Sequence, residues 1–212
     1  MIEHGGHRVL VAHADDRLRS AACGLTRTPR IACPLGDDES IRRMATAWTT
    51  RPESAQDVSA VREVNLATFP TTVEADLVDA LRDSDAWIDG LSIVAEDREG
   101  HVVGHALLTR CHIGDSPALA LAPCAVLPRV QRRGVGSAAI RAALSAARAM
   151  GENLVVVLGH PDYYPRFGFV PASSLGIQPS FQVPDEAPMA LALDPDAETP
   201  RGTITYPAPF GV

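Results

Sequence analysis

A buried strand, a glycine loop and a long helix follow one another in the middle of this chain, and together they limit its fold more than any other feature. Residues 118–126 are almost all apolar, as expected for a strand covered on both faces of a sheet. Gly134 and Gly136 follow, and apolar side chains then recur at helical spacing through residues 135–150 until Gly151. This order predicts a mixed α/β fold around a central sheet.

Residue patterns elsewhere predict the other elements of such a fold. Ser54-Ala55-Gln56-Asp57 and the pair Thr71 and Glu74 are typical of helix N-termini, so an amphipathic helix is expected after each. Asp97-Arg98-Glu99-Gly100 is typical of a tight hairpin turn. Strands are expected at 48–51, 91–96, 102–108, 118–126, 154–158, 189–193 and 203–206, and a short helix at 161–167.

One domain preceded by an extension is the expected organisation. Residues 1–43 show no sustained period of 2 or 3.6, apart from a short strand at 8–12, and are predicted to be a poorly ordered extension. Because the regular pattern begins just after Met44, this methionine is a candidate for the true start of the protein. Residues 48–212 are long enough for one domain with a substantial core.

The composition argues against several classes of protein. With 26 acidic and 19 basic side chains and a net charge of −7, the chain lacks the basic surface of proteins that bind nucleic acid or anionic membranes. It has no apolar run of about 18 residues, and residues 1–7 lack the basic and apolar pattern of a secretory signal, so neither a membrane span nor secretion is expected. Its four cysteines form no CxxC pair, so free thiols in a reducing cytoplasm are expected. No metal site is expected, because the spacing of His4, His7, Cys23 and Cys33 matches no usual zinc pattern.

The loop from Gln131 to Ser137 has the chemistry of a phosphate-binding site. Glycine lets the backbone approach a ligand closely, and the first amides of a helix are unpaired and carry a partial positive charge. Three guanidinium groups stand beside the glycines in a chain that is acidic overall, namely those of Arg129, Arg132 and Arg133. A pyrophosphate is therefore a candidate ligand.

Other interpretations of the same loop remain open at this level. A P-loop is excluded, because no Gly-Lys-Ser/Thr follows. Gly134-x-Gly136-x-x-Ala139 also matches a dinucleotide-binding fingerprint, although the nearest acid, Glu152, precedes the next strand instead of ending it. An ordinary glycine-rich helix start is the third alternative.

Two motifs together resemble a known family. The segment from Gln131 to Ser137 resembles the Q/R-x-x-G-x-G/A pyrophosphate loop of the GNAT acetyltransferase superfamily, and residues 125–128 before it resemble that superfamily's fourth strand. Residues 159–169 resemble the Y-x-x-x-G-F segment that follows its fifth strand. Within them, the sequence Tyr-Tyr-Pro-Arg-Phe-Gly-Phe is similar to that of the YhbS-like branch. The resemblance covers residues 48–212.

The resemblance implies both a fold and a co-substrate. Helices should flank a central mixed sheet in which two central strands splay apart and admit the pantetheine arm of acetyl-CoA. The arm should pair with a strand edge like an added strand, and the pyrophosphate should lie on the loop. The residues implied to contact acetyl-CoA are Cys124, Ala125, Val126, Leu127, Gln131, Arg132, Arg133, Gly134, Val135, Gly136 and Ser137.

Tyr164 is the catalytic residue that the resemblance implies. It stands four residues before Gly168, at the position of the superfamily's usual acid, and a phenol is suited to protonate a departing thiolate. Packing of the short helix is the alternative role. The general base stays open between His160, Asp162 and a water chain, because residues 119–124 contain no acid. Cys124 is either a transient acyl carrier or a small buried thiol.

These features predict an N-acetyltransferase that transfers the acetyl group of acetyl-CoA to an unidentified amine by direct attack in a ternary complex. A non-catalytic acyl-CoA sensor or interaction module of the same fold is the alternative. The acceptor is expected to be the amine of a small molecule or a peptide, and the negative net charge favours a cationic one. A homodimer is a further expectation, because dimers are common among members of the superfamily.

Overall fold

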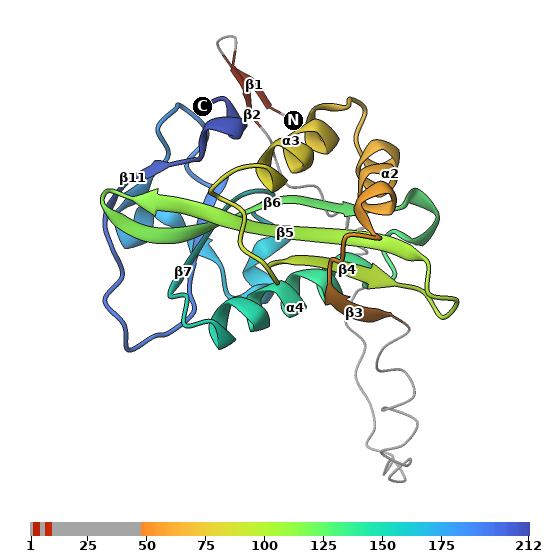
Figure 1. Cartoon of the computed structure of the whole chain (residues 1–212). Helices are drawn as coiled ribbons and strands as arrows, with labels where there is room; N and C mark the ends of the chain where they lie inside the picture. Colours follow the sequence, from red (N-terminus) through yellow and green to blue (C-terminus); the bar gives the residue numbers. More distant parts are fainter. Residues whose placement is uncertain (1, 5–6, 10–47) are drawn as a thin grey trace, which may run out of the picture.

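The computed structural model describes residues 2–4, 7–9 and 48–212 (Figure 1). Near the N-terminus, β1 (Ile2–His4) and β2 (His7–Val9) form an antiparallel pair. The strand expected at 8–12 overlaps only β2. The other predictions for residues 1–43, and that of Met44 as the true start, concern residues outside the described part of the chain and stay predictions.

The main sheet contains nine strands and is mostly antiparallel. Its parallel pairs are β6 with β7 and the short β9 with β11. The strands are β3 (Thr49–Pro52), β4 (Ser92–Glu96), β5 (Val102–Ile113), β6 (Ser116–Val126), β7 (Leu154–Leu158), β8 (Val170–Pro171), β9 (Ile177–Gln178), β10 (Pro188–Ala192) and β11 (Gly202–Thr205).

Helices cover both faces of this sheet, as expected for the mixed α/β class. Figure 1 shows α4 on one face and α2 and α3 on the other, and each side has its own apolar core. No helix in the described residues is long and apolar enough to cross a membrane. The α-helices are α2 (Val58–Thr68), α3 (Val73–Arg82) and α4 (Val135–Ala149), and the 3-10 helices are η1 (Pro128–Val130), η2 (Tyr164–Phe167), η3 (Ala172–Leu175) and η4 (Ala208–Phe210).

Some expected boundaries were wrong, each for a local reason. Neither Ser54 nor Thr71 caps a helix: the N-cap residues are Asp57 and Thr72, without a side-chain capping bond. The Asp57 carboxylate instead accepts hydrogen bonds from Ser54 and Arg51. The short helix expected at 161–167 is only the 3-10 turn η2, because Gly168 at φ +96° ends it.

The strand expected at 102–108 continues to Ile113. Its extension contains Arg110 and His112, which break the apolar pattern that the prediction used. The Arg110 guanidinium pairs with the Glu152 carboxylate at 2.7 Å and 2.5 Å, and β11 adds a further strand beside His112 and Ile113. These distant partners keep the polar segment in the sheet.

The two central strands splay apart, as the fold class implied. β6 and β7 pair at Leu119 with Val155 and at Ala120 with Val156. Against β5, β6 then carries one extra residue, since Ala106 lies opposite Cys124 while Leu108 lies opposite Leu121. A bulge of this kind bends its strand. Beyond Ala120 the edge of β6 therefore has no β7 partner, and a gap opens between the two strands.

Candidate active site

The glycine loop presents a row of unpaired backbone donors at the start of α4. Within the described residues, no hydrogen bond uses the backbone N–H groups from residue 132 to residue 137. Gly134, at φ +85°, is the N-cap of α4, and Arg132 also has a positive φ of 59°. Arg132 and Arg133 are exposed. Unpaired amides at a helix N-terminus beside two cationic side chains are chemically suited to an anion.

Several side chains hold this loop in place. Gln131 Nε2 donates a hydrogen bond of 3.0 Å to the Val126 carbonyl, and Trp48 Nε1 donates one of 2.9 Å to the Arg133 carbonyl. Val135 is buried against β5 at Gly104, where a Cβ atom would lie 2.5 Å from Val135 Cγ1. Of the residues expected to bind acetyl-CoA, Gln131 and Val135 thus position the loop with their side chains.

The strand edge that leads to the loop is largely buried. The side chains of Cys124, Ala125 and Val126 are at most 5% exposed, and Leu127 is half-buried. The Val126 carbonyl accepts hydrogen bonds from both Gln131 and Thr68, at 3.0 Å each. Its two lone pairs are therefore engaged within the protein. Fewer backbone groups of residues 124–127 are therefore available to pair with a ligand.

Tyr164 lies fully buried beside Cys124. Its hydroxyl and the Cys124 thiol are hydrogen-bond partners. Burial raises the pKa of Tyr164 well above its usual value near 10, and burial raises the pKa of Cys124 to about 12. Both groups therefore keep their protons at neutral pH. A thiol with so high a pKa is a poor nucleophile, which argues against Cys124 as an acyl carrier.

Gly159, which follows β7, makes room for the Tyr164 ring. A Cβ atom at position 159 would lie 2.1 Å from Tyr164 Cε2, so the ring rests directly on the backbone there. The amide of Tyr164 donates to the carbonyl of His160, and the ring packs edge-to-face against Tyr163 and Phe169. The sequence interpretation included Gly159 in the tyrosine segment but gave it no role, because a glycine after a strand has no distinctive signal.

The structure brings the two sequence motifs together. The hydroxyl of Tyr163 lies 3.3 Å from Ser137 Oγ, so the tyrosine segment contacts the first turn of α4. The guanidinium of Arg166 lies over the Tyr163 ring at 4.4 Å. Trp48, Gly104 and Gly159 are positioning residues that the sequence interpretation did not single out.

The other histidines and acids weighed as catalytic groups lie in different surroundings. His160 and Asp162 are exposed, as is His112. His105 is fully buried between Ser92 Oγ at 2.9 Å and Asn65 Nδ2 at 3.3 Å. Burial, and then the charge of Arg82, lowers the pKa of His105 to about 3. His105 is therefore a neutral structural residue.

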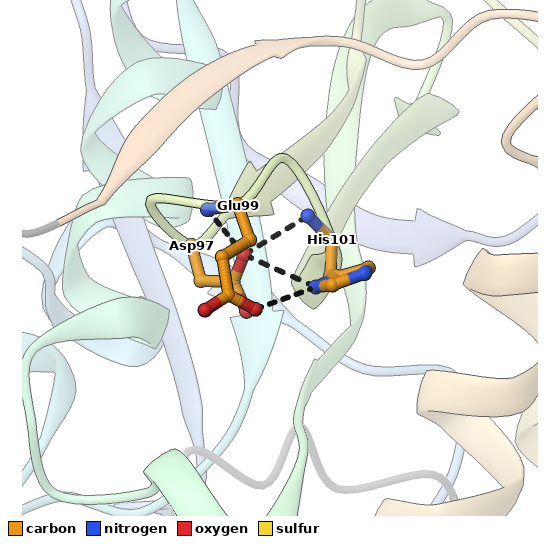
Figure 2. A group of neighbouring side chains, drawn as sticks. All are labelled: Asp97, Glu99 and His101. Carbon is orange, nitrogen blue, oxygen red and sulfur yellow. Dashed lines mark hydrogen bonds and ion pairs between the residues drawn. The ribbon is translucent and has the colours of Figure 1, made fainter.

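One cluster with metal-ligand chemistry occurs within residues 48–212, at the turn between β4 and β5. It contains Asp97, Glu99 and His101, which Figure 2 shows around the hairpin. Asp97 Oδ1 accepts hydrogen bonds from the backbone N–H groups of Glu99 and His101, both at 3.0 Å. Asp97 thus closes the turn, as aspartate commonly does.

Comparison with known proteins identifies the family. Residues 58–169 match the model of the acetyltransferase (GNAT) family. The chain belongs to this family. It is 42% identical over 135 residues to the uncharacterized N-acetyltransferase YjhQ of Escherichia coli, covering 61% of this chain and 74% of the relative. It is 31% identical over 121 residues to the uncharacterized N-acetyltransferase YhbS of the same organism, covering 56% and 71%.

Two solved structures agree with this family. The Escherichia coli YhbS structure in complex with CoA has a TM-score of 0.74 at 25% identity, covering 79% of this chain and 94% of its own. A GNAT acetyltransferase of Brucella melitensis in complex with acetyl-CoA has a TM-score of 0.64 at 32% identity, covering 77% and 97%. The GNAT fold, the YhbS-like branch and the acetyltransferase class are thereby confirmed. The dinucleotide-binding alternative was wrong.

Proposed function

We propose that the protein transfers an acetyl group from acetyl-CoA to an amine, and that residues 48–212 carry this activity. The unpaired backbone N–H groups from residue 132 to residue 137, beside Arg132 and Arg133, support this proposal most. Such a loop suits a pyrophosphate. The structures of the YhbS and Brucella melitensis relatives contain CoA and acetyl-CoA, which supports the same ligand here.

Acetyl-CoA would extend from this loop into the gap between β6 and β7. The loop from Gln131 to Ser137 would hold the pyrophosphate. The backbone groups of residues 124–127 other than the engaged Val126 carbonyl would pair with the amides of the pantetheine arm, because β7 no longer pairs there. This arrangement brings the thioester toward Tyr164. The Tyr164 side chain lies beside Cys124, and Cys124 is on β6.

The residues then allow direct attack within a ternary complex. The lone pair of a neutral amine attacks the thioester carbonyl carbon, a C–N bond forms and the C–S bond breaks. Tyr164 donates its proton to the leaving thiolate, and the proton released by the nitrogen returns to Tyr164 through water. The products are an N-acetylated amine and the free thiol. Burial raises the pKa of Tyr164, so its hydroxyl keeps its proton at neutral pH and can act as the donor in this step.

A non-catalytic acyl-CoA sensor of the same fold is the second candidate function. One observation favours it: residues 119–124 provide no carboxylate that could act as a general base. In that case the loop would bind acetyl-CoA as in the enzyme, but no amine would accelerate release of the thiol. Turnover with an amine therefore separates the two candidates.

Calorimetric titration of acetyl-CoA into the full chain tests the cofactor site. We expect micromolar binding that weakens at least tenfold in the double variant Arg132→Ala/Arg133→Ala, because two charges beside the pyrophosphate are lost. The matched control is Arg148→Ala/Arg201→Ala, which removes two exposed arginines elsewhere and should bind normally. Failure of the unchanged protein to bind acetyl-CoA would refute the proposed function.

A further inference from the structure

A small cavity lies at the closed end of the gap between β6 and β7. The last pair of residues that joins the two strands is Ala120 with Val156, and both line the cavity. Residues 120–122 of β6 form one wall and residues 156–158 of β7 form another. The cavity has a volume of about 20 Å³, enough for about one water molecule. No side chain that lines it carries a charge.

This cavity comes directly after the proposed position of the thioester. From the glycine loop the chain leads back along β6 to Cys124, the hydrogen-bond partner of Tyr164. A co-substrate with its pyrophosphate on the loop would therefore have its sulfur beside Cys124 and Tyr164. Its acyl group would continue in the same direction, toward Ala122 on β6 and Leu158 on β7. Leu158 directly precedes Gly159, on which the Tyr164 ring rests.

The cavity has two strand walls and one aromatic wall. Leu121 and Val157 are at most 3% exposed and belong to the core beneath α4, so the strand walls are fixed by the packing of that core. The aromatic wall contains Phe181, Tyr206 and Phe210. Neighbouring ring centroids in this wall are 6.1 Å and 5.3 Å apart, so each ring packs against the next. A group larger than the cavity would have to displace one of these rings.

We infer that the cavity receives the methyl group of the acetyl group, and that Phe181 and Tyr206 limit the acyl chain to this length. The inference rests on the proposed function, because it places the thioester beside Tyr164. A cavity for about one water molecule has room for about one methyl group, and its apolar lining favours burial of such a group. Each further methylene would overlap the packed rings or the strand walls, and such overpacking is unfavourable. Longer acyl groups would therefore bind weakly.

Phe181 is the part of the wall that a substitution can remove without opening the main core. It is half-buried and lies in the irregular loop between β9 and β10. Phe181 and Val183 from the same loop both pack against Leu158 and Ala187, in a cluster distinct from the core beneath α4. Val183 is not one of the residues that line the cavity. Val183→Ala therefore removes apolar contacts of the same loop without enlarging the cavity, and it is the matched control for Phe181→Ala.

Calorimetric titration of a thioester series into the full chain tests the inference without an acceptor amine. The probes are acetyl-CoA, propionyl-CoA and butyryl-CoA. In the unchanged protein we expect the Kd for butyryl-CoA to exceed that for acetyl-CoA about tenfold or more, with propionyl-CoA in between. Phe181→Ala should bring the Kd for butyryl-CoA to within about threefold of that for acetyl-CoA, because the cavity is then larger. Val183→Ala should keep the selectivity of the unchanged protein.

The outcomes separate this inference from the proposed function. If butyryl-CoA binds the unchanged protein as tightly as acetyl-CoA does, the cavity does not limit the chain and only this inference fails. It also fails if Phe181→Ala and Tyr206→Ala bind acetyl-CoA normally, which shows that they are folded, and still discriminate against butyryl-CoA as the unchanged protein does. If no thioester binds the unchanged protein, the proposed function fails and the inference with it.

Discussion

Two fully buried groups lie on opposite faces of the sheet, and they differ in their partners. Tyr164 packs in the core beneath α4, and His105 lies beneath α2. Burial shifts both toward the neutral form, since it raises the pKa of Tyr164 and lowers that of His105. A shifted pKa by itself therefore does not separate a catalytic residue from a structural one.

The two groups differ in their hydrogen-bond partners. Asn65 Nδ2 donates to His105 Nδ1, His105 Nε2 donates to Ser92, and Ser92 donates to Glu53, which pairs with Arg82 at 2.7 Å. Both ring nitrogens of His105 are thus engaged in a chain that ends at an ion pair. Tyr164 is instead hydrogen-bonded to a thiol, which is a weak donor and a weak acceptor, next to the gap between β6 and β7. A stronger acceptor arriving there, such as a leaving thiolate, can replace that bond.

Removal of the Tyr164 hydroxyl is the largest expected effect. In Tyr164→Phe we expect kcat to fall by about 10²-fold or more, because the leaving thiolate loses its proton donor. The Kd for acetyl-CoA should stay within twofold. Steady-state thiol release and calorimetry on the same preparation measure both values. An unchanged kcat would show that Tyr164, like His105, has a structural role.

Filling the space under the Tyr164 ring should come next. Gly159→Ala places a methyl group where the ring lies, so we expect a loss of about 1–3 kcal/mol in the free energy of unfolding and a lower kcat. In a Tyr164→Ala background the same change should cost much less, since the clash is gone. Urea unfolding of the unchanged protein, the two single variants and the double variant completes this double-mutant cycle. Additive losses would show that the ring contact does not control the site.

The hydrogen-bond chain of His105 should affect stability and spare catalysis. Ser92→Ala leaves Glu53 and His105 Nε2 without their shared partner in a buried region, which costs about 1–3 kcal/mol. We expect a lower urea midpoint, with kcat and the Kd for acetyl-CoA close to those of the unchanged protein. A selective loss of kcat at normal stability would instead assign His105 to the reaction.

Titration should separate the two groups at opposite ends of the pH scale. His105 has a pKa of about 3 in the folded protein and about 6.5 when unfolded, so the unfolded chain binds more protons below pH 6.5. Stability from this group falls by up to about 1.4 kcal/mol per pH unit as the pH drops from 6.5 toward 3. For Tyr164 the loss begins instead above pH 10, where the unfolded phenol ionises first.

Urea unfolding at pH 7.0 and pH 5.5 measures the loss of stability that we expect from His105 at acid pH. Both values lie above the ordinary pKa values of carboxylates. We expect a decrease of about 1 kcal/mol that is absent in His105→Gln. An equal decrease in His105→Gln would assign the acid sensitivity to another group.

Local patterns predicted much of the fold. The strand at 154–158 was predicted with its boundaries, and the turn from Asp97 to Gly100 joins β4 and β5 as expected. The start of α4 at Val135 was also predicted, because glycine and apolar spacing are local signals. The extension of β5 was not predicted, since Arg110 depends on Glu152, which is distant in the sequence. Trp48 was missed as a loop anchor for the same reason, because its partner is the carbonyl of Arg133.

The sequence alone determined the GNAT family, and it supplied the glycine loop and Tyr164 as the groups behind the proposed phosphate site and acid, because each depends on residues close together in the chain. Only the tertiary structure decided that Tyr164 lies against Gly159 and Cys124, and that aromatic residues close the strand gap. Residue spacing determines which side chains share a helix or strand face, but contacts between segments far apart in the chain depend on the packing of the whole core.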